Sequence, residues 1–242
     1  MKKARSMAAE NERMGALVQV GDNCGTGDSR HVFEAIAADL LEKGYSIKPN
    51  AVPTNLLDGL WQQLRSTPSH QFDPAGVGRQ RAHMVNNFIR SDTISWIERE
   101  TVAGENWLNW AVELQQYLNR RLFLGLFSFE SHFSHYAPGD FYKKHLDAFK
   151  GQSNRVLSVV LYLNPDWMPD DGGELALYHN DHSHHGERSQ NVLKVTPSMG
   201  TFVAFLSEEF PHEVLPAKRD RYAIAGWFRV NTTSAERADP PN

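Results

Sequence analysis

The stretch NRVLSVVLYLN, residues 154–164, decides the fold class of this chain. It is a dense run of valine, leucine and tyrosine, which is typical of a strand inside a sheet. Similar short runs surround it, and turn residues such as Pro138-Gly139 separate them. These runs are LFSFESHFSHY (126–136), ELALYHN (174–180), NVLKVTP (191–197), GTFVAFLS (200–207), HEVLPA (212–217) and RYAIAGWFRVN (221–231). Many short strands at regular spacing predict a β-sandwich or barrel.

The first half of the chain has helical periodicity instead. Apolar residues recur at helical spacing from Ser29 to Gly44, over 54–65 and over 105–122. Gly44 is expected to end the first helix, and Thr54 to cap the second. Short strands are expected at YSIKP (45–49) and within NNFIRSDTISWI (86–97). Helices followed by strands predict a mainly β, α+β fold in which N-terminal helices support a β-sandwich.

The pattern also predicts the domain organisation. Residues 1–28 lack periodicity and are expected to be loosely ordered. The remainder, 29–242, is expected to form one domain. Within it, 29–122 would supply helical support and a substrate loop, and 123–231 the β core.

Composition excludes some function classes. The formal net charge is −4, which argues against a non-specific nucleic-acid partner or a membrane surface, because both attract a positive field. Cys24 is the single cysteine, so no internal disulfide is expected. The first 20 residues have no apolar core typical of a secretory signal, and no run is long enough to span a bilayer. The expectation is a soluble cytoplasmic protein.

A possible metal site lies in FYKKHLDAFK, residues 141–150, where His145 and Asp147 are two positions apart. On a strand, such residues point to the same face, so an imidazole and a carboxylate would share one space. The pair alone is equally compatible with an ordinary polar patch. A facial triad on iron(II) needs a second histidine, and His212 is the best candidate because it opens a predicted strand.

The positions that such a triad leaves open suit a bidentate co-substrate and dioxygen. 2-Oxoglutarate needs a cation for its distal carboxylate, and the planar fork of arginine suits this role. Arg221 begins the next predicted strand, and a hairpin returning from His212 would bring it into the same barrel. The alternative role for Arg221 is a structural ion pair.

Several segments together resemble the iron- and 2-oxoglutarate-dependent dioxygenases, and among them the prolyl hydroxylases of the egl-nine type and their bacterial relatives. These segments are YAPGDFYKKHLDAF, NRVLSVVLYLNPDW, DGGELALY, FPHEVLPA and RYAIAGWF. The resemblance extends from about residue 89 to Val230 and implies a double-stranded β-helix (jelly-roll) core. It implies that the iron ligands are His145, Asp147 and His212.

The resemblance also implies roles for residues around the metal. Arg221 would bind the distal carboxylate of 2-oxoglutarate with help from the hydroxyl of Tyr162, and Tyr136 would lie beside the co-substrate. Trp227 would line the pocket. Regions that contact a peptide substrate correspond to the loop 74–91 and to Arg155, Arg90 and Asp92. Simple packing is the alternative for both tyrosines, and a solvated strand edge is the alternative for Arg155.

The sequence departs from the family pattern in two places. Ala225 stands where the animal enzymes have a threonine, which could alter how water or dioxygen reaches the iron. The segment HNDHSHHGERSQN (179–191) is longer and richer in histidine than in those enzymes. A second metal site is one interpretation of His179–His185, and an exposed loop is the other. His132 and His135 are expected to be structural unless they face the iron pocket.

The predicted function is hydroxylation of a prolyl residue in a protein or peptide substrate, dependent on iron(II), 2-oxoglutarate and dioxygen. Succinate and carbon dioxide would be co-products, and ascorbate the reductant. One alternative is a hydroxylase of a free amino acid or another small substrate. Another is a non-catalytic sensor of iron and 2-oxoglutarate.

Overall fold

The computed structural model describes residues 29–76, 88–148, 154–180 and 190–231, so the segment 1–28 with Cys24 lies outside the described residues. The helices are α1 (Arg30–Lys43), α2 (Thr54–Ser66), α3 (Val102–Leu122) and the short 3-10 helices η1 (Ser69–Gln71) and η3 (Pro169–Asp171). The strands are β1 (Tyr45–Lys48), β2 (Asp73–Pro74), β3 (Thr93–Trp96), β4 (Leu126–Tyr136), β5 (Tyr142–His145), β6 (Arg155–Tyr162), β7 (Leu175–Asn180), β8 (Gln190–Val195), β9 (Phe202–Leu206), β10 (His212–Val214) and β11 (Arg221–Val230). None of the described helices is long and apolar enough to cross a membrane.

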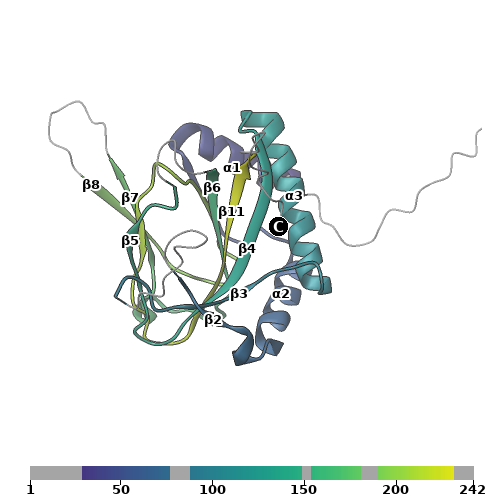
Figure 1. Ribbon diagram of the computed structural model, residues 1–242. Helices are drawn as coiled ribbons and strands as arrows, with labels where there is room; N and C mark the ends of the chain where they lie inside the picture. The colour runs from purple at the N-terminus through teal and green to yellow at the C-terminus, as the bar shows by residue number, and fades with distance from the viewer. Residues whose placement is uncertain (1–28, 77–87, 149–153, 181–189, 232–242) are drawn as a thin grey trace, which may run out of the picture.

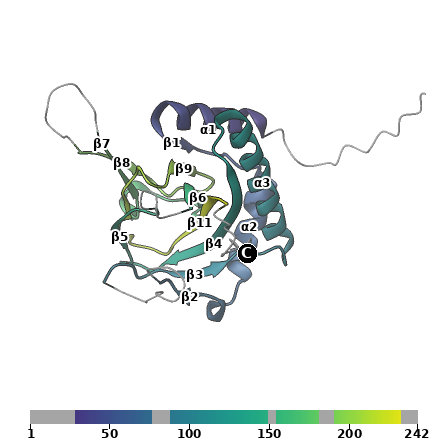
Figure 2. The ribbon, with the colours of Figure 1, turned by 45° about the horizontal axis from the view of Figure 1, so that its top comes forward.

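The strands form two antiparallel sheets that face each other. The larger has the order β1-β9-β6-β11-β4-β3-β2, and the smaller has the order β5-β10-β7-β8. Figures 1 and 2 show α1, α2 and α3 covering one side of the larger sheet, while the smaller sheet lies on its other side. This arrangement confirms the predicted mainly β fold with helical support, because each run that predicted a strand after residue 123 carries one.

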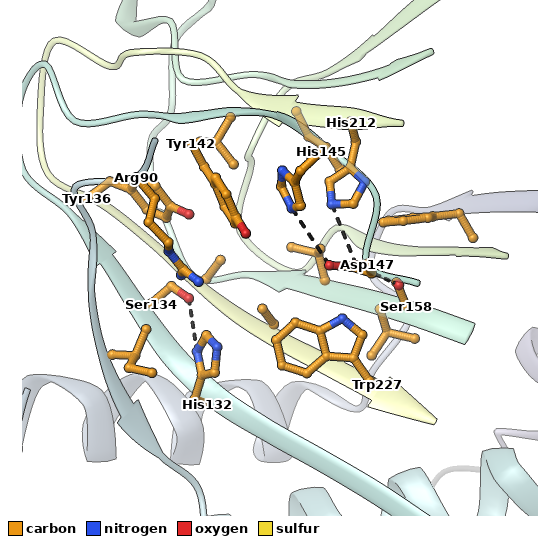
Figure 3. Close-up of a pocket in the computed structure, with 18 of the residues that line it drawn as sticks. Arg90, His132, Ser134, Tyr136, Tyr142, His145, Asp147, Ser158, His212 and Trp227 are labelled. Carbon is orange, nitrogen blue, oxygen red and sulfur yellow. Dashed lines mark hydrogen bonds and ion pairs between the residues drawn. The ribbon is translucent and has the colours of Figure 1, made fainter. Parts of the chain in front are cut away.

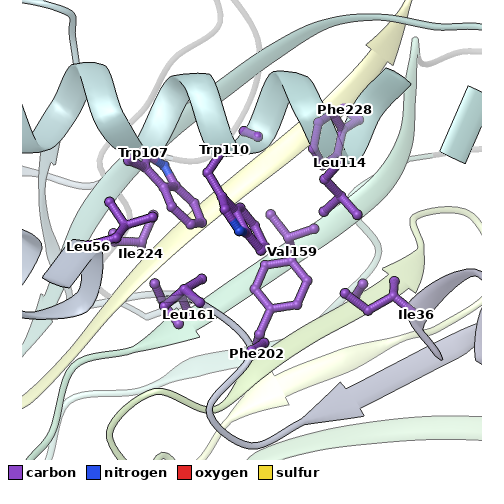
Figure 4. Close-up of a cluster of buried hydrophobic side chains, with 14 of the residues drawn as sticks. Ile36, Leu56, Trp107, Trp110, Leu114, Val159, Leu161, Phe202, Ile224 and Phe228 are labelled. Carbon is purple, nitrogen blue, oxygen red and sulfur yellow. The ribbon is translucent and has the colours of Figure 1, made fainter. Parts of the chain in front are cut away.

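The main apolar core lies between the larger sheet and the helices (Figure 4). Trp107 and Trp110 of α3 stack with ring centroids 5.5 Å apart, and Trp110 meets the ring of Phe202 edge-on at 5.4 Å. The indole N–H of Trp107 donates to the hydroxyl of Ser131 at 3.0 Å. Burial of each such large side chain contributes about 1.5–3 kcal/mol. The predicted helical stripes are therefore core.

The helix ends follow local chemistry, with one correction. Gly44 has a φ of 76° and donates its N–H to the carbonyl of Leu40, which ends α1 as predicted. The prediction that Thr54 caps α2 is wrong, because Pro53 occupies the N-cap with an extended backbone and Thr54 is already helical. An N-cap side chain needs non-helical φ and ψ, so the hydroxyl of Thr54 cannot take that role.

The N-terminal half contributes strands as well as helices to the domain. β1 extends one edge of the larger sheet beside β9, and β3 and β2 extend the other edge beside β4. Local periodicity favoured strands at β1 and β3, but the pairing partners lie far along the chain. The division into support (29–122) and core (123–231) stays a prediction, and three strands of the first part join the larger sheet.

Candidate metal centre

A cavity of about 310 Å³ lies between the two sheets, and side chains from both line it (Figure 3). Strand alternation decides which residues reach it. Every second residue at the start of β11 faces the cavity: Arg221, Ala223, Ala225 and Trp227. The residues of β11 that belong to the core on the helix side include Ile224 and Phe228. One strand therefore serves the core with one face and the cavity with the other.

His145, Asp147 and His212 meet at one side of this cavity. His145 ends β5 and lies opposite His212, which begins β10. The Nε2 atoms of His145 and His212 lie 3.7 and 3.6 Å from the two carboxylate oxygens of Asp147. The three potential ligand atoms are all within 4.8 Å of one another. Two imidazoles and one carboxylate form the donor set of a facial triad, so the group fits an iron(II) ion.

The backbone fixes which nitrogen of each ring faces the centre. Nδ1 of His145 lies 2.8 Å from the carbonyl oxygen of Lys143, and Nδ1 of His212 lies 3.0 Å from that of Phe210. A carbonyl only accepts, so each Nδ1 carries the proton and donates it. Each Nε2 is left with a lone pair directed toward Asp147, which is the tautomer that a metal requires.

A hydroxyl chain orients the carboxylate. The hydroxyl of Ser158 on β6 donates to Oδ2 of Asp147 at 2.7 Å. The hydroxyl of Ser207 lies 2.8 Å from that of Ser158. Because Ser158 has one proton and gives it to Asp147, Ser207 donates to Ser158. Groups of this kind, one step removed from a metal, hold its ligands in place.

The protonation states suit metal binding at neutral pH. Burial, together with the nearby His212, lowers the pKa of His145 to about 3. Burial alone would raise the pKa of Asp147, but His212, His145 and the hydrogen bond from Ser158 lower it to about 2. His145 is therefore neutral and Asp147 charged, which are the forms that bind a metal.

Two local expectations about this site are wrong. His145 and Asp147 do not share one strand face, because β5 ends at His145 and Asp147 lies in the following bend. β10 and β11 do not form a hairpin either, since they belong to different sheets. Arg221 reaches the cavity because the two sheets face each other across it.

Arg221 is the second feature of the cavity. Its side chain is buried, and its Nε donates to the carbonyl of Gly173 at 2.8 Å. Its guanidinium carbon lies 5.0 Å from the ring centre of Tyr136 and 5.2 Å from that of Tyr162. No carboxylate among the described residues pairs with Arg221, so the structural ion pair is not seen there. A buried cation without an anion is costly, so the position fits an anionic ligand.

The two tyrosines beside Arg221 are buried donors. Tyr136 lies opposite Arg221 in the strand register and lines the cavity. Tyr162 does not line the cavity itself, but its hydroxyl is buried without a hydrogen-bond partner among the described residues. Burial raises the pKa of Tyr162 to about 12, and burial raises that of Tyr136 well above its ordinary value. Both hydroxyls stay protonated at neutral pH.

Arg90 and Asp92 form a buried ion pair at the side of the cavity. Nε and Nη2 of Arg90 donate to the two carboxylate oxygens of Asp92 at 2.7 and 2.6 Å. The guanidinium lies over the ring of Tyr142 at 4.4 Å. Arg90 lines the cavity, whereas Asp92 is 1% exposed and is absent from the lining. The geometry therefore makes Asp92 a residue that positions Arg90.

Arg155 and Trp227 pack together at the cavity wall. The guanidinium of Arg155 lies 3.8 Å from the ring centre of Trp227 and donates to Glu130 at 2.9 Å. Glu130 also accepts a hydrogen bond from Arg229. The indole N–H of Trp227 is buried and has no partner among the described residues. The cavity wall therefore contains the guanidinium of Arg155, which Glu130 holds in place, next to the indole N–H of Trp227, which has no partner among the described residues.

Sequence reasoning missed several lining residues. Tyr142 stacks on the ring of His145 at 3.5 Å, and Trp96 meets the ring of His132 edge-on at 5.2 Å. His132 faces the pocket and is buried, and burial followed by nearby Arg90 lowers its pKa to about 3. The position of Tyr142 in the quoted FYKKHLD stretch was an available signal. The role of Ser158 could be recognised only once the strand register was known.

Other predicted features lie apart from the cavity or outside the described residues. Nε2 of His135 lies 2.7 Å from a carboxylate oxygen of Asp220, and His135 does not line the cavity. Residues 77–87 of the predicted substrate loop 74–91 lie outside the described residues. The same holds for 181–189, which includes His182, His184 and His185 of the suggested second metal site, while His179 lies in β7.

Comparison with protein families gives a match over residues 131–229 to the 2OG-Fe(II) oxygenase superfamily. A solved prolyl-4-hydroxylase from Pseudomonas putida is 37% identical, with a TM-score of 0.70, and the match covers 82% of this chain and 98% of that one. A prolyl hydroxylase from Trichoplax adhaerens, solved with a peptide fragment of the hypoxia inducible factor oxygen degradation domain, is 28% identical with a TM-score of 0.70. That match covers 83% of this chain and 90% of the other.

Two curated proteins match over shorter segments. The hypoxia-inducible factor prolyl hydroxylase of Caenorhabditis elegans is 35% identical over 92 residues, which is 37% of this chain. A prolyl 3-hydroxylase of Mus musculus is 36% identical over 88 residues, which is 35% of this chain. The matched segments span only 12% and 15% of those two proteins.

Proposed function

Because this chain belongs to the 2OG-Fe(II) oxygenase superfamily, we propose that it hydroxylates a prolyl residue of a protein or peptide, using iron(II), 2-oxoglutarate and dioxygen. Succinate and carbon dioxide are the co-products of this reaction. Ascorbate serves as reductant, and the cytoplasm as the site of action, within the same proposal.

The main support for the proposal is a buried arginine that no carboxylate of the described residues pairs with, in the same cavity as a two-histidine, one-carboxylate group. A structural sandwich has no use for this combination, because both features cost stability. A facial triad leaves positions open on the metal, and a 2-oxoacid that chelates there carries a second carboxylate. The guanidinium of Arg221 fits that carboxylate.

Different residues would bind the iron and the 2-oxoglutarate. His145, Asp147 and His212 would hold the iron, which supplies the activation of dioxygen and of the substrate C–H bond when it is bound. Arg221 would orient the distal carboxylate of 2-oxoglutarate, and the hydroxyl of Tyr162 would donate to the same group. The dry surroundings of both donors strengthen these hydrogen bonds.

Aromatic side chains support proline as the substrate group. Trp96 and Trp227 line the cavity and offer aromatic surface to a pyrrolidine ring. The solved relatives named as prolyl hydroxylases have the same fold and cover most of this chain. Arg90 and Arg155, held by Asp92 and Glu130, would meet the polypeptide around that ring.

Binding of 2-oxoglutarate tests the proposed role of Arg221. Titration calorimetry on the iron(II)-loaded protein without oxygen should give weaker binding for Arg221→Met by at least about 100-fold, the loss expected for a charge-assisted pair in a dry site. Arg221→Lys keeps the charge without the fork and should lie between the two. The matched control is Arg219→Met, since Arg219 is exposed and lies outside the cavity. Unchanged binding by Arg221→Met would contradict the proposal.

Product analysis tests the reaction. Mass spectrometry of cell proteins incubated with the loaded enzyme should find an added oxygen on proline, together with succinate. Fragmentation and amino-acid analysis decide between 4-hydroxyproline, which we propose, and 3-hydroxyproline. Succinate formed only with a free amino acid would favour the small-substrate alternative, and binding without any turnover would favour a sensor.

A further inference from the structure

A second cavity of about 340 Å³ adjoins the first, and Trp96 lines both. Its walls are the end of α2 with the residues before β2, the end of β3, and the segment that leads into α3. The lining residues are Gln63, Ser66, Thr67, Pro68, Gln71, Ser95, Trp96, Glu98, Glu100, Thr101 and Phe133. Trp96 is 53% exposed, which is unusual for so large an apolar side chain. The indole ring of Trp96 therefore forms part of the wall of each cavity.

The second cavity lies where the sheet has an open edge. β2 pairs only Asp73 with Ile94 and Pro74 with Thr93. Ser95 and Trp96, the last two residues of β3, therefore have no strand on their outer side within the described part of the chain. An open strand edge accepts an extended peptide through backbone hydrogen bonds. A polypeptide leaving the first cavity over Trp96 would meet this edge.

The charged residues known to line the second cavity are both acidic. Glu98 and Glu100 are exposed members of its wall, and neither forms an ion pair with a described basic residue. None of the described residues that line it is a lysine, arginine or histidine. The arginines of the first cavity, Arg90 and Arg155, are in contrast already paired with carboxylates. An unpaired acidic wall beside an open strand edge complements a basic segment of polypeptide.

From these observations we infer that the second cavity is a substrate-selectivity subsite, in which Glu98 and Glu100 bind a lysine or arginine a few residues from the target proline. The inference rests on the proposed function, because it assumes that the substrate is a polypeptide. Trp96 separates the prolyl ring in the first cavity from the extended backbone that passes into the second. The substrate class is then an extended, basic, proline-containing segment.

Peptides with one movable charge test this inference. Each peptide contains one proline in a neutral background and a lysine placed at successive positions on either side, and a norleucine peptide is the neutral reference. Binding is measured by fluorescence anisotropy on the protein loaded with iron(II) and 2-oxoglutarate without oxygen. Hydroxylation is then measured with oxygen by mass spectrometry. One or two lysine positions should improve both Kd and KM, with kcat unchanged.

Variants of Glu98 and Glu100 test whether these two residues cause the preference for lysine. Glu98→Gln with Glu100→Gln should remove the preference for lysine, which amounts to about two- to fivefold for each exposed pair. Glu98→Lys with Glu100→Lys should make a glutamate peptide bind better than the lysine peptide. Glu113→Gln, an exposed change on α3 outside both cavities, is the matched control and should keep the preference. Added salt should weaken the preference in the wild type only.

The outcomes separate this inference from the proposed function. A lysine preference in binding that the glutamine variants abolish, with no hydroxylation of any peptide, would support the subsite and count against prolyl hydroxylation. Hydroxylation with no dependence on lysine position, or with a preference that survives the glutamine variants, would overturn the subsite alone. Thermal unfolding shows whether Glu100, just before the N-cap Thr101, acts only by stabilising α3. In that case its variants lower the melting temperature and leave the lysine preference intact, which also overturns the inference.

Discussion

The two faces of the larger sheet differ in how many polar groups they bury. On the helix side, indole, phenyl and aliphatic groups pack against each other, and the indole N–H of Trp107 is satisfied by Ser131. On the cavity side lie the buried Arg221, the Tyr162 hydroxyl and the Trp227 indole N–H, for which the described residues supply no anion and no hydrogen-bond partner, respectively. Trp110 is the exception on the helix side, where its N–H lacks a described partner. The helix-side face therefore mainly stabilises the fold, whereas the cavity-side face combines an apolar cluster, which includes Val203 and Phe205, with polar groups kept for ligands at a cost in stability.

Removal of a metal ligand is expected to have the largest effect on activity. His212→Ala should lower turnover by at least about 1000-fold, because a catalytic metal contributes several kcal/mol. The metal-free variant should stay folded, because the apolar cluster around the site, which includes Leu177, Val203 and Phe205, is unchanged. Iron content and turnover provide the measurement. His135→Ala on the outside of β4 is the control, and equal loss in both variants would contradict the assignment.

The opposite result is expected on the helix side. Leu114 of α3 is fully buried in the core, so Leu114→Ala should lower the free energy of unfolding by about 2–5 kcal/mol. Turnover per folded molecule should stay unchanged, because the side chain lies across the sheet from the cavity. Urea unfolding and activity at a temperature where the variant is folded test both parts. Loss of activity in the fully folded variant would show that the two faces are coupled.

A smaller effect is expected one step away from the metal. Ser158→Ala removes the hydroxyl that donates to Asp147 and should weaken iron binding by about 10- to 100-fold. Ser131→Ala is matched, because it removes a hydroxyl that serves Trp107 on the helix side. It should lower stability and leave iron affinity intact. Competition with a metal-binding dye measures the affinities, and equal affinities in the two variants would argue against the orienting role of Ser158.

The smallest effect is a pH dependence of stability. The pKa of His132 is about 3 in the folded protein, below the ordinary value of 6.5. The unfolded state therefore takes up the proton first as the pH falls, and stability decreases below about pH 6.5 by about 1 kcal/mol per pH unit for this group. His132→Gln should make the slope shallower in urea unfolding of the metal-free protein. An identical slope would place the titration elsewhere, for example at His145, whose pKa is also low.

The parts of the fold that were predictable depended on local pattern. The composition of 154–164 indicated a strand, and the spacing of apolar residues located the helices because amphipathic periodicity is a property of neighbouring residues. The start of α3 was placed at residue 105, although the helix begins at Val102. Its cap, in which Thr101 accepts from the N–H of Gly104, lies ahead of the apolar stripe. The role of Ser158 was missed, and the place of His132 in the pocket was left open, because both depend on distant strands.

What the sequence by itself determined is the chemistry of the ligands and the fold class: His145, Asp147, His212 and Arg221 are the residue types that iron and a dicarboxylate need, set among segments with the periodicity of strands and helices. Only the tertiary structure decided how these residues meet. The bend after β5, the separation of β10 and β11 into different sheets, and the shared role of Trp96 arise from long-range pairing. Side-chain chemistry is encoded residue by residue, whereas convergence depends on register and sheet packing, which no local stretch contains.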